Sequence, residues 1–219
     1  LGLDQIQVGD AGLVIGACCT IQALLESDAV FTPIHEAARN IVNRHVRNVA
    51  TVGGQIGAND TWGDLLPALV ALEASVALVT PAGDTSVPVE CYLAGPPAGL
   101  IARVRIPIPA PKRSTGVRNY AATATDESLV TAAASLTRER DVARNPIVAV
   151  GGVANHVMRL EAVEQALDGR APPNRDEIEK LVAAAVSPPS DHRGSAAYRK
   201  HLAGVIVASA IQAAWQGVR

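Results

Sequence analysis

Aromatic residues are scarce in this sequence: they make up 3% of its 219 residues, although 48% of the residues are hydrophobic. A core must therefore be built from Ala, Val, Leu and Ile, and a platform of aromatic rings for stacking nucleobases is nearly excluded. Positive charge is not in excess, because 19 Lys and Arg stand against 21 Asp and Glu, for a formal net charge of −2. We therefore expect no nucleic-acid partner and no attraction to an anionic membrane surface.

Cysteines and long apolar runs are also few. Cys18, Cys19 and Cys91 do not form a disulfide framework, and the adjacent pair lacks the spacing of zinc ligands. No apolar run approaches the ~20 residues that span a bilayer, and no signal peptide is visible. We expect a cytoplasmic protein with free thiols and no membrane span. The chain begins at Leu1 rather than Met, so we expect that an N-terminal part is missing.

Period-two and period-3.6 patterns occur along the same chain, which predicts an α+β protein. Strands are expected at 4–8, 13–18, 75–80, 85–89, 100–106 and 147–150, and helices at 32–45, 61–72, 161–167, 175–186 and 196–216. The proline-rich segment 107–111 is the best candidate for a domain boundary. The segment 128–136 is ambiguous, because its many alanines favour a helix and its extended neighbours favour a strand.

The sequence from Thr51 to Gln55, Thr-Val-Gly-Gly-Gln, is the most informative motif. Two glycines without Cβ atoms let backbone N–H groups face a ligand, and Thr51 and Gln55 add a hydroxyl and an amide. Such a nest suits a phosphate or a heteroaromatic carbonyl. The signal alone is weak, since a Gly-Gly turn is more often structural. The phosphate-loop ending Gly-Lys-Ser/Thr and the dinucleotide fingerprint Gly-x-Gly-x-x-Gly are both absent.

Conventional catalytic groups are not convincing here. The five histidines are scattered without metal-ligand spacing, and neither Cys18 nor Cys19 has an evident base near it in the sequence. Asp60 and Asp64 stand at i and i+4, which would place an acid–base pair on one helix face. Asp60 is the better candidate for a helix cap. Trp62 stacks on a ligand ring or borders the entrance of the site, or else it packs in the core or lies on the surface.

A longer pattern identifies the chain with a family. An ordered series of motifs resembles the flavin-binding subunit of the molybdenum hydroxylases. The motifs are Arg47-Asn48-x-x-Thr51-Val-Gly-Gly54, Asn59-Asp60, Asp64 and 67–74. That family includes the medium subunit of aerobic carbon monoxide dehydrogenase and the central domain of xanthine dehydrogenase. Further matches follow in order nearly to the end of the chain: Ile15-Gly-Ala17, Leu100–Pro107, Gly151-Gly-Val153, Arg159, Ser190-Asp-x-Arg193 and Tyr198-Arg199.

The resemblance implies FAD as the cofactor and implies which residues bind it. The predicted cofactor-binding residues are Thr51, Val52, Gly53, Gly54, Gln55, Asp60, Asp64, Ile101 and Arg118. In relatives the Thr/Ser-x-Gly-Gly loop lines FAD near the flavin ring and the diphosphate. An aspartate can accept a hydrogen bond from a ribose hydroxyl or a flavin N–H, which favours Asp64 as a ligand residue. No catalytic or metal-ligating residue of the chain itself is implied.

The resemblance also implies two domains. Residues 1–107 would form the second lobe of an FAD-binding domain of the PCMH type, a mixed sheet with flanking helices. Residues 112–219 would form a C-terminal domain, a three-stranded antiparallel sheet packed on helices, in which 128–136 is a strand. Relatives carry an N-terminal lobe with an Ala-Gly-Gly-Thr/Ser loop before the point that corresponds to Leu1.

The implied function is that of an oxidoreductase. Electrons would run from a molybdopterin-binding large subunit through a [2Fe-2S] small subunit to FAD, and then to NAD⁺, oxygen or quinone. One alternative is a scaffold or assembly subunit that keeps the fold without binding FAD. Another is an α/β protein that binds an unrelated small molecule. The substrate of the complex would be chosen by the molybdenum subunit, which is a different chain.

Overall fold

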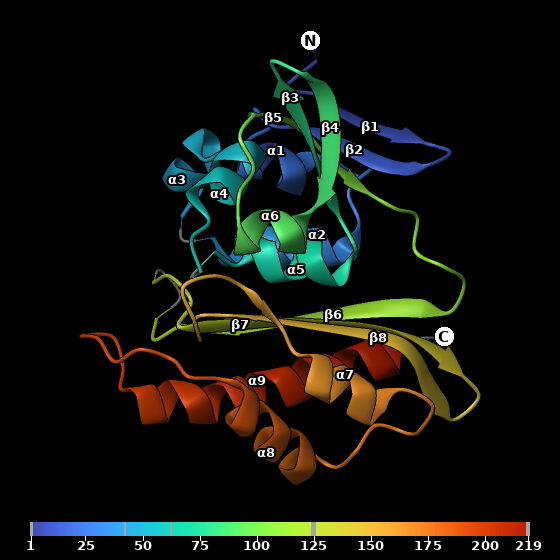
Figure 1. The fold of residues 1–219 in the computed structure, drawn as a ribbon, viewed down its shortest axis with the longest axis vertical. Coiled ribbons are helices and arrows are strands. Elements are labelled where there is room, and N and C mark those ends of the chain that lie inside the picture. Colours follow the sequence, from blue (N-terminus) through green and yellow to red (C-terminus); the bar gives the residue numbers. More distant parts are fainter. Residues whose placement is uncertain (1, 42, 62, 124–125, 218–219) are drawn as a thin grey trace.

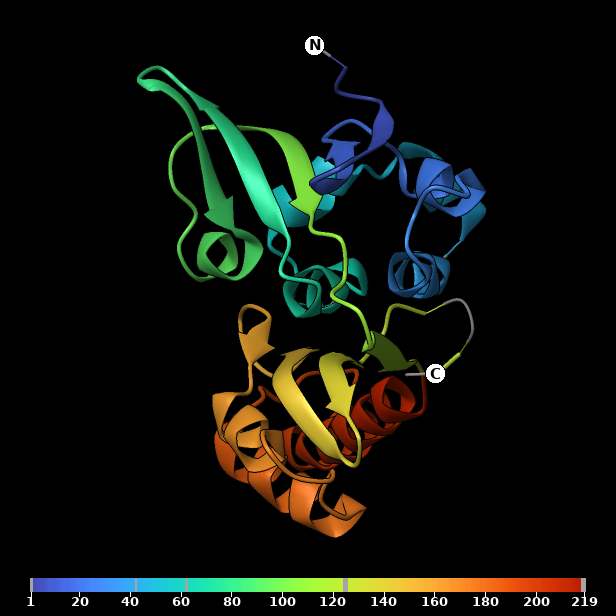
Figure 2. The same cartoon turned by 90° about the vertical axis from the view of Figure 1, so that its right-hand side faces the viewer.

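The computed structural model describes residues 2–41, 43–61, 63–123 and 126–217. Figure 1 shows two domains stacked along the long axis of the molecule. The N-terminal domain holds a five-stranded sheet and the helices α1 to α6, and the C-terminal domain holds a four-stranded sheet and the helices α7 to α9. This arrangement confirms the predicted α+β class. The C-terminal sheet lies between the helix α5 above it and the helix α9 below it (Figures 1 and 2).

The N-terminal sheet has the strand order β1-β2-β5-β3-β4. The strands are β1 (Ile6–Gly9), β2 (Gly12–Gly16), β5 (Leu100–Ile106), β3 (Ser75–Thr80) and β4 (Gly83–Pro88). Every strand pair of this sheet that the structure describes is antiparallel, so the prediction of a mixed sheet was wrong. Two-residue turns join β1 to β2 and β3 to β4, and such short connections allow only antiparallel neighbours.

The helices of this domain are short. They are α1 (Ile21–Glu26), α2 (Thr32–Asn40), α3 (Arg44–Val49), α4 (Val52–Ala58), α5 (Leu65–Ala71) and α6 (Val89–Ala94). The predicted helix 32–45 was wrong in its second half, because α2 ends at Asn40. A new helix starts at Arg44, where the Asn43 side chain accepts a hydrogen bond from the Val46 N–H. Val42, which belonged to the predicted helix face, lies outside the described residues.

Helix α5 is the layer that joins the two domains. All seven of its residues are buried, and it contacts the C-terminal strands β7 and β8 as well as its own domain. A helix that is apolar around its whole circumference must be surrounded by protein. The run Leu65-Leu-Pro-Ala-Leu-Val-Ala71 has that composition, which explains its central place in Figure 1.

The C-terminal sheet has the order β6-β7-β8-β9 and is antiparallel throughout its described strands. The strands are β6 (Arg113–Tyr120), β7 (Val130–Glu139), β8 (Val142–Gly151) and β9 (Met158–Arg159). The predicted three-stranded sheet was wrong by one strand, the two-residue β9. The ambiguous segment 128–136 enters β7 and is extended. Its alanines are buried on both faces of the sheet, where only small side chains fit between the layers.

Three helices cover the outer face of this sheet: α7 (Glu161–Leu167), α8 (Arg175–Ala185) and α9 (Ala196–Gly217). Helix α9 lies close against β6 and β7. A Cβ placed on Gly116 would lie 2.5 Å from the carbonyl oxygen of Ala210, so this contact requires glycine in β6. The predicted helices 161–167, 175–186 and 196–216 are confirmed to within one residue at each end.

Candidate functional site

The Gly-Gly pair lies in the first turn of a helix and not in an open loop. Thr51 is the N-cap of α4, and its Oγ1 accepts a hydrogen bond of 3.1 Å from the Gly54 N–H. The Val52 N–H donates to the Cys19 carbonyl at 2.9 Å, and the Gly53 N–H donates to the Ala17 carbonyl at 2.8 Å. The first N–H groups of α4 are therefore used within the protein. The predicted nest of free N–H groups was wrong.

The first glycine of α4 instead allows the helix to pack closely against another segment of the chain. A Cβ on Gly53 would lie 2.7 Å from the Cβ of Ala17, so Gly53 lets α4 pack on the segment after β2. Gly54 and Gly57 are exposed. An added Cβ at Gly54 would lie 2.9 Å from the capping Thr51 Oγ1, which is too close, whereas at Gly57 it would lie 3.6 Å from Ile101 Cδ1, an ordinary contact.

One face of helix α4, formed by Gly54, Gly57 and Ala58, is therefore exposed to solvent and carries almost no side chains. We call this the bare face of α4. Ile101, half-buried in β5, borders it through Gly57. The structure thus brings Ile101 next to the helix that carries Val52 to Gln55, as the predicted site requires. A planar ring can approach backbone closely where no Cβ intervenes.

Asp60 and Asp64 do not share a helix face. Helix α5 begins at Leu65, Asp64 holds its N-cap position without a capping hydrogen bond, and Asp60 lies in the preceding turn. The predicted capping by Asp60 was therefore wrong, and so was the i, i+4 pair. The Asp60 carbonyl accepts a 2.9 Å hydrogen bond from the Gly63 N–H. Trp62 lies outside the described residues.

Asp64 is buried at the junction of the two domains, with 3% of its surface exposed. Its Oδ1 accepts a hydrogen bond from the Thr131 hydroxyl of β7. Burial raises the pKa of Asp64 to about 6, and the hydrogen bonds from Ser128 and Thr131 partly oppose that rise. A carboxylate of the N-terminal domain is thus held by hydroxyls of the C-terminal domain.

A second contact closes the same end of the junction. The Gly152 N–H donates to Thr61 Oγ1 at 3.1 Å. A Cβ on Gly151 would lie 2.6 Å from the Thr61 carbonyl oxygen. The Gly151-Gly152 motif therefore allows the turn before α5 to lie directly against the end of β8. We call these contacts, together with those of Asp64, the closed end of the junction.

Two arginines hold the segment that reaches Asp64. Arg193 Nη2 donates to the Glu127 carbonyl at 2.6 Å and to the Ser128 carbonyl at 3.1 Å. Arg199 is fully buried and donates to the Leu129 carbonyl at 3.3 Å. It also donates to Asp191 Oδ1 at 2.5 Å, which lowers the pKa of Asp191. The motif Ser190-Asp-x-Arg193 with Tyr198-Arg199 therefore supports Ser128, which faces Asp64.

Ser128 and Thr131 were not singled out from the sequence as site residues. They lie more than sixty positions beyond Asp64, and no local pattern joins residues across that distance. Arg118 belongs to a different place. It is exposed on β6 and lines a separate hollow of about 540 Å³ with Phe31, Glu36 and other residues. The structure places Ile101 beside Gly57 of α4, the helix that carries the predicted residues, and it does not add Arg118.

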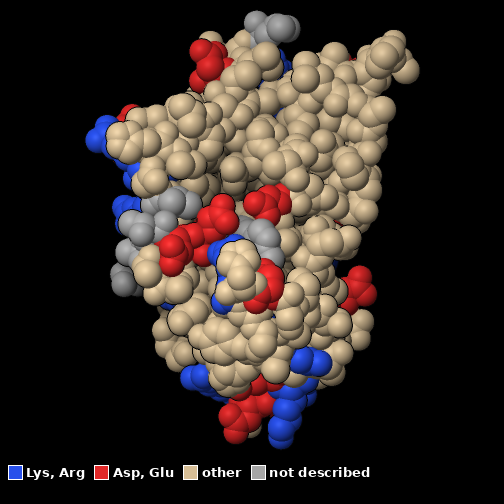
Figure 3. Space-filling model, turned by 90° about the vertical axis from the view of Figure 1, so that its left-hand side faces the viewer, with Lys and Arg blue, Asp and Glu red and all other residues tan. Residues whose placement is uncertain are grey.

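Charge is distributed unevenly on the side of the molecule that carries α3 and α4. Figure 3 shows acidic and basic side chains gathered near the junction of the two domains, whereas much of the N-terminal domain above it is uncharged. At the junction Arg193 pairs with Glu127 at 3.4 Å, and Arg159 pairs with Glu90 at 3.3 Å. Among the described residues, no helix combines the length and apolarity needed to cross a bilayer.

Comparison with known families agrees with this architecture. Residues 1–109 match the FAD binding domain in molybdopterin dehydrogenase, and residues 118–214 match the CO dehydrogenase flavoprotein C-terminal domain. The chain belongs to the family of FAD-binding medium subunits of the molybdenum hydroxylases. The resemblance found in the sequence is thereby confirmed.

Individual relatives agree. The uncharacterized protein YgfM of Escherichia coli K12 is 37% identical over 209 residues, which are 95% of this chain and 75% of that protein. The glyceraldehyde dehydrogenase medium chain of Sulfolobus acidocaldarius is 28% identical over 96% of this chain and 78% of its own length. The carbon monoxide dehydrogenase medium chain of Afipia carboxidovorans is 29% identical over 96% of this chain and 78% of its own length. Named relatives are thus subunits of oxidoreductases.

Solved structures share the fold. Carbon monoxide dehydrogenase from Hydrogenophaga pseudoflava superposes with a TM-score of 0.91 at 28% identity, over 99% of this chain and 79% of that one. Quinoline 2-oxidoreductase from Pseudomonas putida 86 gives a TM-score of 0.87 at 25% identity over the same shares. The two-domain architecture described above is therefore that of a carbon monoxide dehydrogenase medium chain.

Proposed function

We propose that this chain, as a flavin subunit, passes electrons from a molybdopterin-binding large subunit and a [2Fe-2S] small subunit through FAD to an acceptor. The observation that carries the proposal is the bare face of α4 bordered by Ile101, within a fold whose relatives include carbon monoxide dehydrogenase medium chains. We also propose the cytoplasm as its compartment, because three free cysteines suit a reducing environment.

The residues present fit the cofactor. Gly54 and Gly57 are exposed and carry no Cβ, and at Gly57 an added Cβ would meet Ile101 Cδ1 only at 3.6 Å, so a flat ring can lie against α4 where a larger side chain would block it. When bound, FAD supplies the redox chemistry, and the protein supplies orientation and hydrogen bonds. We propose that Thr51, Gly54, Gln55 and Ile101 line the ring and that Asp60 lies at its border. The buried Val52 and the half-buried Gly53 would hold α4 in place against the segment after β2. Arg118 stays a predicted contact.

Asp64 has a different part in this proposal. Its side chain is buried and already accepts hydrogen bonds from Thr131 and Ser128. It therefore acts as a positioning residue, because it ties the turn between α4 and α5 to the C-terminal domain. The Gln55 side chain reaches that turn, since its Oε1 lies 3.5 Å from the point where a Cβ of Gly63 would be. Asp64 thus acts on the cofactor site through this turn.

The experiment is flavin retention by a variant of the bare face. Gly57→Asp places a carboxylate on that face, where an added Cβ lies an ordinary 3.6 Å from Ile101 Cδ1, and we expect the purified intact chain to lose the visible flavin absorbance. Gly95→Asp is the matched control, because Gly95 is exposed and an added Cβ there meets no described atom within 4 Å. Flavin retained equally by both variants would contradict the placement of FAD on α4.

A scaffold subunit without FAD is the second candidate. One observation favours it: the first N–H groups of α4 donate to Ala17, Cys19 and Thr51, so they do not offer free donors to a diphosphate. The parent protein decides between the two candidates in the same spectrum. Parent protein that assembles with its partner subunits but carries no flavin would support the scaffold.

A further inference from the structure

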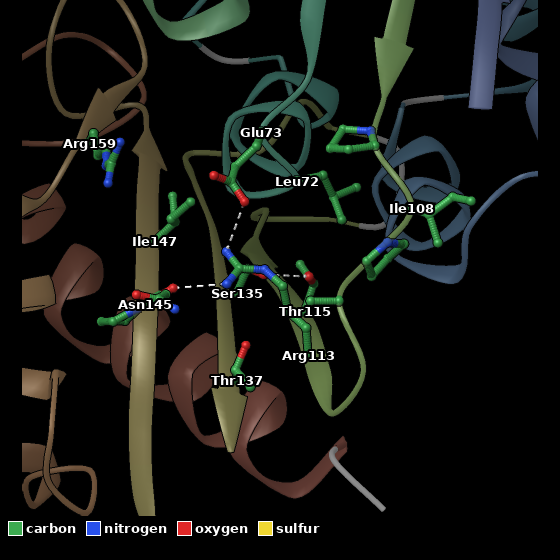
Figure 4. A pocket seen from close by; sticks show the side chains of 14 residues that line it. Leu72, Glu73, Ile108, Arg113, Thr115, Ser135, Thr137, Asn145, Ile147 and Arg159 are labelled. Carbon is green, nitrogen blue, oxygen red and sulfur yellow. Dashed lines mark hydrogen bonds and ion pairs between the residues drawn. The ribbon is translucent and has the colours of Figure 1, made fainter. Parts of the chain in front are cut away.

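A second hollow opens between the domains, at the opposite end of the junction from Asp64. It measures about 490 Å³ and lies beneath the end of α5 and the linker 107–110, over the C-terminal sheet (Figure 4). That volume is within the usual range for small-molecule pockets of ~300–1,000 Å³. We call it the linker cavity. No residue of the proposed flavin site lines it.

Arg113, the first residue of β6, carries the main charge inside the linker cavity. Its side chain is 9% exposed, and its Nη1 donates to the Asn145 carbonyl at 2.9 Å. Nη2 is buried and has no hydrogen-bond partner among the described residues. It lies 3.4 Å from Glu73 Oε2, in an ion pair whose acidic side chain is 58% exposed. Figure 4 shows the guanidinium between Glu73 and Asn145.

A buried donor without a hydrogen bond is costly, and a guanidinium recognises a carboxylate through paired N–H groups. Burial lowers the pKa of Arg113, whose charge is incompletely solvated. Arg159 at the same cavity is already paired with Glu164 at 2.8 Å and with Glu90 at 3.3 Å. Arg113 is therefore the better placed cation for an incoming anion.

The rest of the lining combines hydroxyls and apolar walls. Thr115 and Thr137 present hydroxyls from β6 and β7, and the Thr115 hydroxyl donates to Oγ of the fully buried Ser135 at 3.0 Å. Leu72, Ile108 and Ile147 supply apolar surface. We propose that the linker cavity is a binding site for a small organic monocarboxylate. The carboxylate would take the place of the exposed Glu73 side chain beside Arg113 Nη2 and accept from it, and a compact apolar body would lie against Leu72, Ile108 and Ile147.

The linker cavity is separate from the proposed flavin site. Asp64 contacts Thr131 near the start of β7, whereas Thr137 lines the cavity near the end of that strand. Six strand residues at ~3.3 Å each span about 20 Å. A ligand here would touch both domains and the linker that joins them. Its effect would be to fix the domains relative to each other, and the failure of the flavin proposal would leave this one standing.

The test is calorimetric titration of the intact chain with benzoate, with inorganic phosphate and sodium chloride as comparison anions at constant ionic strength. We expect saturable one-site binding of benzoate. Arg113→Gln should weaken it by about tenfold or more, because a hydrogen bond to a charged group is lost. Glu73→Gln should strengthen it by about threefold, because a competing carboxylate is removed. Arg175→Gln, a change of an exposed arginine on α8, is the control and should leave it unchanged.

Ile108→Glu keeps the test decisive if Arg113→Gln does not fold. Ile108 is 55% exposed at the rim, so its replacement spares the core. We expect Ile108→Glu to weaken benzoate binding by about fivefold through charge repulsion, and Ile108→Gln to weaken it less. Absence of saturation, equal binding by Ile108→Glu and Ile108→Gln, or phosphate bound more tightly than benzoate would each overturn the monocarboxylate site.

Discussion

The two ends of the domain junction are built differently. At the closed end, Asp64 meets Thr131 without intervening space, and Gly151 lets the Thr61 backbone approach to a distance that no Cβ would permit. At the other end, Glu73 and Arg113 form an ion pair beside a cavity of about 490 Å³. The same two domains are therefore tightly packed at the closed end of the junction and loosely packed at the linker end.

The difference shows where the junction is stabilised. Buried hydrogen bonds and close backbone packing resist change, whereas an ion pair with one exposed partner contributes little in water. We infer that the closed end sets the orientation of the domains and that the linker end tolerates adjustment. The predictions that follow test this inference by removing contacts from each end in turn.

Arg199→Leu should have the largest effect. Arg199 is fully buried, and its loss would leave the Leu129 carbonyl without this donor beneath the closed end. We expect a loss of about 3–5 kcal/mol in the free energy of unfolding, as for other broken buried charge networks. Urea unfolding measures it. Lys200→Leu, a change of the adjacent, half-buried position on α9, should cost far less, and equal losses would contradict the role assigned to Arg199.

Gly151→Val tests the close approach itself. The new side chain would lie against the Thr61 carbonyl, so the turn before α5 must move away from β8. We expect a loss of about 2 kcal/mol in the free energy of unfolding, within the range of about 1–3 kcal/mol that is usual for overpacking in a tight contact. Gly9→Val is the control, because an added Cβ at Gly9 meets no described atom within 4 Å. If the two variants unfold at the same urea concentration, the closed end is not sterically tight.

Asp64→Asn tests the electrostatics of the closed end. The pKa of Asp64 is about 6 in the folded state and near 3.8 when unfolded, so the folded state holds the proton more tightly. Proton binding by Asp64 therefore adds to the free energy of unfolding. This addition is fully present below pH 3.8 and is lost as the pH rises to about 6. The parent should therefore lose roughly 2 kcal/mol relative to Asp64→Asn between pH 4 and pH 7. Parallel stability profiles from urea unfolding at each pH would contradict the buried carboxylate.

Much of the fold could be predicted from the sequence, because its elements have regular local patterns. The alternating residues of β1 and the apolar spacing of α9 are local signals, and the structure confirms both elements. Interruptions of helices and very short strands were harder to predict. A continuous apolar pattern concealed the interruption between Asn40 and Arg44, and β9 is only two residues long. Such features depend on tertiary packing rather than on local periodicity.

In the candidate site, too, features with a local sequence pattern could be predicted and features that depend on tertiary packing could not. The motif from Thr51 to Gln55 and the strand residue Ile101 could be named from resemblance, and the structure places Ile101 beside Gly57 of the helix that begins in this motif. The direction of the N–H groups could not be predicted, since it depends on Ala17 and Cys19, which lie on another element. Ser128 and Thr131 were also inaccessible to local reasoning, because the domain junction alone brings them to Asp64.

Glu73→Gln should have the smallest effect on stability. Glu73 is 58% exposed and lies 3.4 Å from Arg113 in an ion pair, so solvent screens much of the attraction. Arg113 Nη1 keeps its hydrogen bond to the Asn145 carbonyl in the variant. We expect a loss below about 1 kcal/mol in the free energy of unfolding at low salt, and a smaller loss at high salt. A loss as large as that of Gly151→Val would mean that the linker end also holds the domains together, and the contrast between the two ends would fail.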